Sequence, residues 1–161
     1  MDKYKEFQFG WIIFLFVVPA HVLINYLYLT GFGSQPMNLG SILFGNGILT
    51  LIYILFYGLT TQLTEGVLSV SFGIGIIKKK ISLDRVAGVK ETRNNNIYGW
   101  GLRFIPNGIM YNISGNEAVE LKFKDSSRVF RIGTQHSTLL KQEIVKHITT
   151  SSPPITDEKS S

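Results

Sequence analysis

The residues of this chain whose types could carry chemistry are mainly basic. Lys78, Lys79 and Lys80 form one run, and Arg85 and Arg103 follow it. Basic residues close to an anionic membrane surface each contribute about 1 kcal/mol of attraction. In a strand only Lys78 and Lys80 would share a face, because successive side chains alternate. The run is therefore either a contact surface for a partner or lipid headgroups, or an edge strand whose lysines block pairing with another chain.

A second candidate contact residue is Trp100, which lies between Gly99 and Gly101. In a loop it would expose an aromatic ring to a partner or to the lipid interface. Alternatively, the glycines form a bend that lets Trp100 fill the interior. The motif does not match a phosphate-binding loop, because Gly-x-Gly lacks the third glycine and no Gly-Lys-Ser/Thr follows.

The residues needed for catalysis or metal binding are scarce. The chain has no cysteine, which excludes thiol nucleophiles and thiolate zinc sites. His136 and His147 would lie about 16 Å apart along one helix, too far to share a metal. We therefore predict no catalytic residue, no metal, no cofactor and no enzymatic activity. Nucleic acid is also not expected, because aromatic residues are not interleaved with the basic ones.

The elements that position these residues begin with two apolar segments. From Phe7 to Thr64 there is no Lys, Arg, Asp or Glu. Residues 11–28 and 42–59 are each about 27 Å long as helices, close to the thickness of a hydrocarbon core, about 30 Å. Turn-forming residues separate them. The sequence predicts a transmembrane hairpin as a domain of residues 1–58.

The distribution of basic residues predicts the orientation of this hairpin. Residues 31–41 contain no Lys or Arg, whereas residues 59–150 hold 13 Lys and Arg against 7 Asp and Glu. By the positive-inside rule, both termini are expected on the cytoplasmic side of the cell inner membrane. Lys3 and Lys5, followed by Val18-Pro19-Ala20, also fit a cleaved signal peptide. The apolar run continues beyond that site and a second span follows, which favours the hairpin.

Two polar residues fall within the first span. His21 and Asn25 are four residues apart and share a helix face. Polar groups in hydrocarbon need partners, and Asn46 or Thr50 of the second span can supply them. We interpret them as an interhelical hydrogen-bonding pair. The alternative is a proton or ligand relay, although the spans contain no Asp or Glu to drive one.

After the spans the pattern changes to alternating polar and apolar residues. We expect strands at residues 67–72, 76–83, 86–93, 102–104, 109–113, 119–124 and 128–132, and residues 60–64 are another candidate strand. An apolar stripe of Leu140, Ile144 and Ile148 predicts an amphipathic helix over residues 134–149. Residues 151–161 are rich in Ser and Pro and are expected to be a disordered tail. The sequence thus predicts a mainly-β domain at 59–150, with about seven strands and a C-terminal helix.

Several ordered motifs in this region resemble the bacterial PH-like (pleckstrin-homology-like) domains. The motifs are at 64–85, 98–103, 109–115, 118–121 and 131–134, and the resemblance covers residues 60–149. It implies a PH-type barrel, often joined to membrane spans in that family. One departure is Gln135-His136-Ser137, where the family often has proline at the start of the helix.

Together, these features lead to two hypotheses about function. In the first, the chain is a non-catalytic, membrane-anchored PH-like interaction module that holds another protein at the cytoplasmic face of a bacterial membrane. In the second, the barrel senses anionic lipid headgroups through Lys78, Lys79 and Lys80. Fold alone does not carry the lipid chemistry of other PH domains over to this chain.

Overall fold

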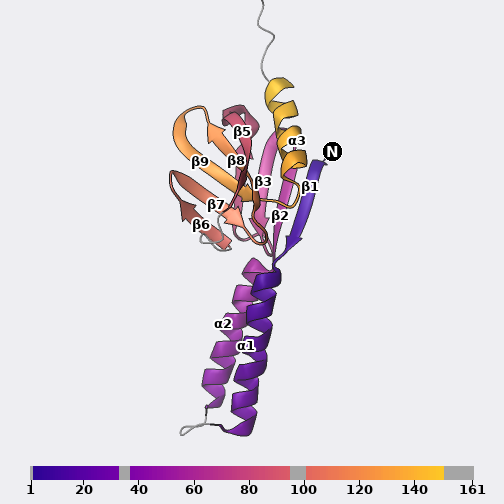
Figure 1. The fold of residues 1–161 in the computed structure, drawn as a ribbon. Coiled ribbons are helices and arrows are strands. Elements are labelled where there is room, and N and C mark those ends of the chain that lie inside the picture. The colour runs from indigo at the N-terminus through magenta and orange to yellow at the C-terminus, as the bar shows by residue number, and fades with distance from the viewer. Residues whose placement is uncertain (1, 33–36, 95–100, 151–161) are drawn as a thin grey trace, which may run out of the picture.

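The computed structural model describes residues 2–32, 37–94 and 101–150. A helical hairpin extends from one end of a β-rich part, and a third helix lies along that part (Figure 1). The proposed tail at 151–161 lies outside the described residues. The described residues therefore show two apolar helices, a mainly-β domain and a C-terminal helix.

The hairpin consists of α1 (Trp11–Thr30) and α2 (Leu39–Phe56). Both helices are long and apolar enough to cross a membrane, and few of their residues are buried. Asn38 caps α2, because its side-chain oxygen accepts a hydrogen bond from the Ser41 amide at 2.8 Å. The second helix ends earlier than the expected residue 59, because Leu59 is fully buried in the β domain.

The first sheet contains four antiparallel strands in chain order. They are β1 (Asp2–Phe9), β2 (Gly58–Thr64), β3 (Val67–Phe72) and β4 (Lys78–Ser82). Strand β1 precedes the first apolar helix and pairs with β2, with Phe9 opposite Gly58. The helical hairpin is therefore an insertion between two paired strands.

Strand β1 is not among the strands that the sequence pattern predicts. Its buried residues are Tyr4, Glu6 and Gln8, whereas Lys5 and Phe7 on the opposite face are exposed. The strand alternates as expected for a sheet, but two of its inward side chains, Glu6 and Gln8, are polar, and the outward residue Phe7 is apolar. The usual pattern of apolar residues inside and polar residues outside is therefore broken, which hides the strand in the sequence.

The second sheet has five strands in the order β5-β8-β9-β7-β6. Its strands are β5 (Val86–Arg93), β6 (Gly101–Ile105), β7 (Gly108–Asn112), β8 (Glu117–Phe123) and β9 (Ser126–Gly133). The short helix η1 (Leu83–Arg85) precedes β5, and α3 (Ser137–Thr150) follows β9. Strands β7 and β9 are parallel, and the other pairs in this sheet are antiparallel. All the predicted strands and the C-terminal helix are present, with ends that differ by a few residues.

The hydrophobic core draws on both sheets and α3. Leu59 and Leu68 of the first sheet and Leu121 of the second are fully buried, as is Leu140 of α3. Pairing among the described strands leaves two separate sheets, so closure of the expected barrel is not found. The open side of this arrangement forms the candidate site.

Candidate functional site

The three lysines of the basic run lie on β4, at one edge of the first sheet. Among the described strands β4 pairs only with β3, with Lys80 opposite Ser69. All three lysines are exposed, whereas Ile81 is buried. Because side chains alternate, Lys79 shares the face of Ile81, and Lys78 and Lys80 share the other. The run therefore presents positive charge on both faces of an edge strand.

A cleft of about 820 Å³ lies between β4 and the second sheet. Its basic side chains come from three separate segments: Lys79 and Lys80 of β4, Arg85 of η1 and Arg128 of β9. Among the described residues that line it, Asp125 is the only acidic one. The excess of positive charge favours a ligand that carries negative charge.

The cleft also has an apolar surface. Its apolar and aromatic lining residues are Ile81, Phe104, Ile109, Phe123, Val129 and Phe130. Phe130 belongs to the core, but Phe104 is 83% exposed. A ligand with both acidic and apolar groups would therefore match the lining.

Backbone hydrogen bonds fix the segments around the cleft. The Leu83 amide donates to the Gly66 carbonyl at 2.8 Å and holds η1 against the β2–β3 turn. The Lys124 amide donates to the Arg85 carbonyl at 2.9 Å. The second bond ties the turn before Arg128 to η1, so the backbone brings the two arginine-bearing segments together.

Most of the cleft lies away from the helical hairpin. Strand β2 starts at Gly58, directly after α2, and β2 and β3 rise from that end of the hairpin (Figure 1). Lys80 lies opposite Ser69, which lies opposite Gln62. At about 3.3 Å per residue, Lys80 is roughly 13 Å along the sheet from Gly58, and Lys78 roughly 7 Å.

Of the two remaining contact candidates, the structure places only Arg103. Arg103 lies on β6 and is exposed, but it does not line the cleft, whereas its neighbour Phe104 does. Trp100 lies outside the described residues. Sequence reasoning missed Phe104 and Arg128. The hairpin pattern at 119–132 locates Arg128 after a turn, but only the folded chain shows that it lines the same cleft as Arg85.

The polar residues of the first apolar helix face the second helix. The Nε2 atom of His21 lies 3.2 Å from the Thr50 hydroxyl. The Asn25 side-chain amide donates to the side-chain oxygen of Asn46 at 3.1 Å. Nδ1 of His21 also lies 3.1 Å from the Val17 carbonyl. The contacts with Thr50 and Asn46 link the two helices at two successive levels.

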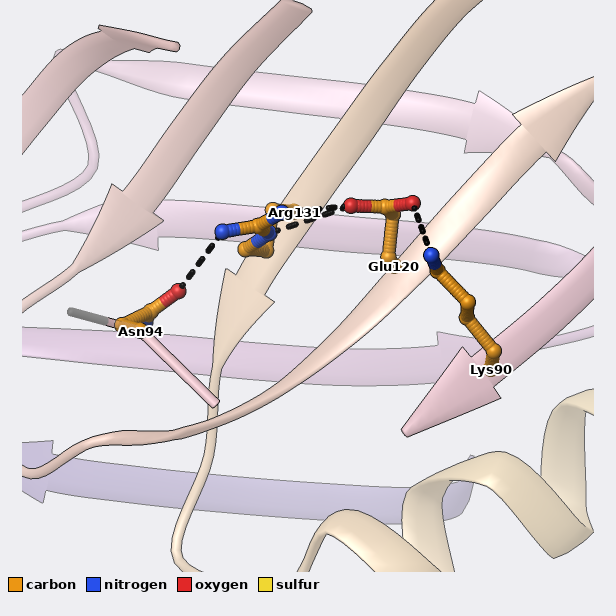
Figure 2. Close-up of polar contacts among 4 residues, drawn as sticks. All are labelled: Lys90, Asn94, Glu120 and Arg131. Atoms are coloured by element: carbon orange, nitrogen blue, oxygen red, sulfur yellow. Dashed lines mark hydrogen bonds and ion pairs between the residues drawn. The ribbon is translucent and has the colours of Figure 1, made fainter. Parts of the chain in front are cut away.

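A separate ionic network lies on the second sheet (Figure 2). Glu120 accepts hydrogen bonds from Arg131 at 2.6 and 3.2 Å and pairs with Lys90 at 3.1 Å. Arg131 also donates to the Asn94 side chain at 3.4 Å. Burial tends to raise the pKa of Glu120, but the bonds from Arg131 and Lys90 outweigh it and lower the pKa. The network lies on the face opposite the core residue Leu121, so it stabilises the sheet rather than lining the cleft.

A second buried polar cluster joins β1 to the start of α3. One carboxylate oxygen of Glu6 accepts from the Tyr4 hydroxyl at 2.5 Å and from the Thr134 hydroxyl at 2.6 Å. The other carboxylate oxygen accepts from the Gln135 backbone amide at 2.8 Å. Burial, followed by the bond to Glu6, raises the pKa of Tyr4 well above its usual range. This cluster fixes the position of α3 and lies apart from the cleft.

Among residues 2–32, 37–94 and 101–150, no group of three or more His, Cys, Asp or Glu side chains is arranged to hold a metal ion. Comparison of the chain with protein-family models, curated proteins and solved structures found no match. The candidate site therefore has to be interpreted from its own geometry. That geometry is a basic cleft with apolar lining beside a sheet edge.

Proposed function

We propose that this chain is a non-catalytic interaction module, held by two membrane spans at the cytoplasmic face of a bacterial membrane. The observation that carries the proposal is the cleft of about 820 Å³ between β4 and the second sheet. Its ligand would be an extended segment of a partner protein that carries acidic and apolar side chains. No cofactor, metal or nucleic acid is part of the proposal.

The edge of β4 supports recognition of an extended segment. An edge strand presents backbone donors and acceptors that can pair with a further strand. Among the described strands, the side of β4 away from β3 has no strand neighbour. Backbone pairing would supply affinity, while Arg85, Arg128 and Phe104 would select side chains on the added segment. Complementary charge would mainly favour fast association and the correct partner.

The helical hairpin supports the membrane-anchored part of the proposal. Helix α1 has 20 residues and α2 has 18, lengths that match the hydrocarbon core of a bilayer. Since β1 and β2 pair directly, both ends of the hairpin emerge on the same side. The absence of Lys and Arg from residues 31–41 favours the cytoplasm as that side.

The PH-like relationship is likewise part of the proposal. Two sheets of short strands followed by one C-terminal helix agree with the architecture that the sequence motifs imply. Two differences are the additional strand β1 and the open side between β4 and the second sheet. We infer a PH-like domain whose barrel is incomplete at the cleft.

Lipid sensing by the basic strand is the second candidate function. Lys78 lies roughly 7 Å along the sheet from the end of the hairpin, within the Debye length of about 8 Å at physiological ionic strength. Lys80 lies beyond that length, and Arg85 follows still further along the chain. We therefore place lipid attraction second, as an auxiliary contact made mainly through Lys78.

Photocrosslinking in cells tests the choice between these functions. A photoreactive amino acid is introduced into the full chain at position 79 or 128, inside the cleft, and at Lys122 as a control. Lys122 is exposed on β8 but does not line the cleft. We expect one protein adduct of the same size from both cleft positions and not from position 122. Arg85→Glu should reduce its yield severalfold.

The other outcomes are equally informative. A phospholipid adduct at both cleft positions that replaces the protein adduct would favour lipid sensing. Adducts of equal yield from all three positions, unaffected by Arg85→Glu, would contradict the cleft as a recognition surface.

A further inference from the structure

The connection between β3 and β4 is an exposed apolar turn. Its residues are Gly73-Ile74-Gly75-Ile76-Ile77. The side chains of Ile74 and Ile76 are 62% and 69% exposed. Isolated exposed apolar residues are common on proteins, but here two isoleucines share one short turn.

This turn lies beside the last turn of α2. The Gly73 amide donates a hydrogen bond to the Gly58 carbonyl at 2.8 Å. The backbone of Gly73 also packs against the carbonyls of Ile54 and Leu55, so that a Cβ atom at this position would lie only 2.1 Å from the Ile54 oxygen. The turn is therefore level with residues inside the apolar helix, at the point where the hairpin joins the β domain.

The conformation of the turn depends on its two glycines. Gly73 has a φ of +49° and Gly75 a φ of +90°, in the left-handed region that glycine adopts without strain. The Phe72 amide donates to the Ile77 carbonyl at 2.9 Å and closes the turn. The isoleucines are thus held by backbone hydrogen bonds at both ends of a short, closed turn.

We propose that the β3–β4 turn inserts Ile74 and Ile76 into the cytoplasmic interface of the phospholipid bilayer. This inference rests on the proposed membrane anchor, and it adds a third membrane contact to the two helices. The turn is fixed against the end of an apolar helix, so a bilayer that surrounds α2 also meets the turn. Burial of both isoleucines in the acyl boundary would remove their apolar surface from water.

The residues around the turn fit an interfacial position. Lys78 follows it directly and can extend its amine to the lipid headgroups. Trp11, at the start of α1, is 61% exposed, and Tyr57 follows the end of α2. Tryptophan and tyrosine are enriched at membrane interfaces. Apolar, aromatic and basic side chains therefore occur in the arrangement expected where a protein enters a bilayer.

This contact would orient the β domain. A hairpin alone would leave the domain able to tilt about the α2–β2 junction. The third contact directly precedes β4, the strand that carries the cleft lysines, so it would hold β4 upright on the membrane. The cleft would then stay at a fixed height above the lipid surface.

The inference can be tested with spin labels on the full chain in vesicles of phosphatidylcholine and phosphatidylglycerol. The chain has no native cysteine, so single cysteines at 74, 76, 67 and 23 each carry one nitroxide. Val67 lies at the far end of β3 and serves as the aqueous control, and Leu23 of α1 reports insertion of the hairpin. Accessibility to oxygen and to a water-soluble nickel complex is compared at each site.

We expect positions 74 and 76 to resemble position 23, with oxygen accessibility above nickel accessibility, and position 67 to show the reverse. A nitroxide at position 78, in a separate single-label chain, should be severalfold more accessible to nickel in the Ile74→Ser, Ile76→Ser double variant than without these substitutions. If position 23 is buried but 74 and 76 behave as 67 does, the inserted turn is wrong and the anchor stands. If position 23 is also exposed to nickel, the anchor itself is wrong.

Discussion

Glu120 is a nearly buried carboxylate that two cations hold in its charged form. Its side chain is 6% exposed, and that of Arg131 is 16% exposed. A buried ion pair is not in itself strong evidence of stability, but removal of one partner leaves the other charge uncompensated. The three side chains come from neighbouring strands, Lys90 on β5, Glu120 on β8 and Arg131 on β9 (Figure 2). The network therefore fixes the register of the second sheet.

We predict that Glu120→Gln lowers the free energy of unfolding by about 2–4 kcal/mol, because Arg131 loses its charged acceptor in a desolvated position. Chemical denaturation of the full chain in detergent micelles, followed by circular dichroism, measures the change. Glu91→Gln is the control, because Glu91 and its partner Lys141 are both 39% exposed, so loss of that pair should change stability much less. Equal effects of the two substitutions would contradict the structural role of the network.

The pH dependence of stability should carry the same signature. The pKa of Glu120 is lowered in the folded chain, so its contribution is present above the ordinary glutamate pKa, about 4.3. It is lost as the pH falls through the folded pKa, because the unfolded chain then binds the proton more readily. Unfolding measured between pH 7 and pH 3 should show a smaller acid destabilisation in Glu120→Gln than in the unchanged chain. The same acid slope in both would contradict this assignment.

At the scale of elements, β1 connects the start of the chain to its last helix. Its inward residue Glu6 accepts hydrogen bonds from Tyr4, Thr134 and the Gln135 amide. The strand thus pairs with β2 through its backbone and holds the start of α3 through its side chains. A charged acceptor in a buried position stabilises this contact only while all of its donors stay in place.

We predict that Glu6→Ala lowers the free energy of unfolding by about 2–3 kcal/mol, because buried donors lose a charged acceptor. Lys5→Ala is a matched control on the same strand, since Lys5 is exposed and should change stability by less than about 0.5 kcal/mol. Thermal unfolding of the full chain in micelles measures both. The double substitution Glu6→Ala, Thr134→Ala should cost less than the sum of the single ones, and full additivity would exclude the shared bond.

Elements also show where sequence reasoning succeeds. Strands β3 and β5 have the predicted limits, because their residues alternate and end at clear turn signals. Both apolar helices were predicted for a similar reason, since a long run without charge has few other structures open to it. In contrast, β1 was missed because Tyr4, Glu6 and Gln8 face inward.

The cleft could be predicted only in part. Lys78, Lys79 and Lys80 were visible as a run, and Lys79 and Lys80 do line the cleft. Arg128 and Phe104, which belong to the second sheet, line the same cleft. A single sequence carries local periodicity but not the register between distant strands, so this grouping required the three-dimensional structure.

At the scale of the whole molecule, the helical hairpin interrupts a β-hairpin. Phe9, at the end of β1, lies opposite Gly58, at the start of β2. The Gly10 amide donates to the Tyr57 carbonyl at 2.8 Å and closes the junction. The sheet therefore brackets the two helices, and residues 2–9 belong to the same folded unit as residues 58–94 and 101–150.

This arrangement leads to a prediction about membrane topology. Lys5 of β1 pairs with Gln62 of β2, so the strand before the spans and the strands after them must lie on one side of any membrane that α1 and α2 cross. Phe32, which follows α1, lies at the other end of the hairpin and is 75% exposed.

In right-side-out vesicles, a membrane-impermeant maleimide should label a cysteine at 32. It should label cysteines at 5 and 65 only after permeabilisation, because the proposed orientation, which follows from the positive-inside rule, places the β domain inside. Labelling of 5 and 65 with protection of 32 would reverse the orientation, whereas different behaviour of 5 and 65 would contradict the pairing of β1 with β2.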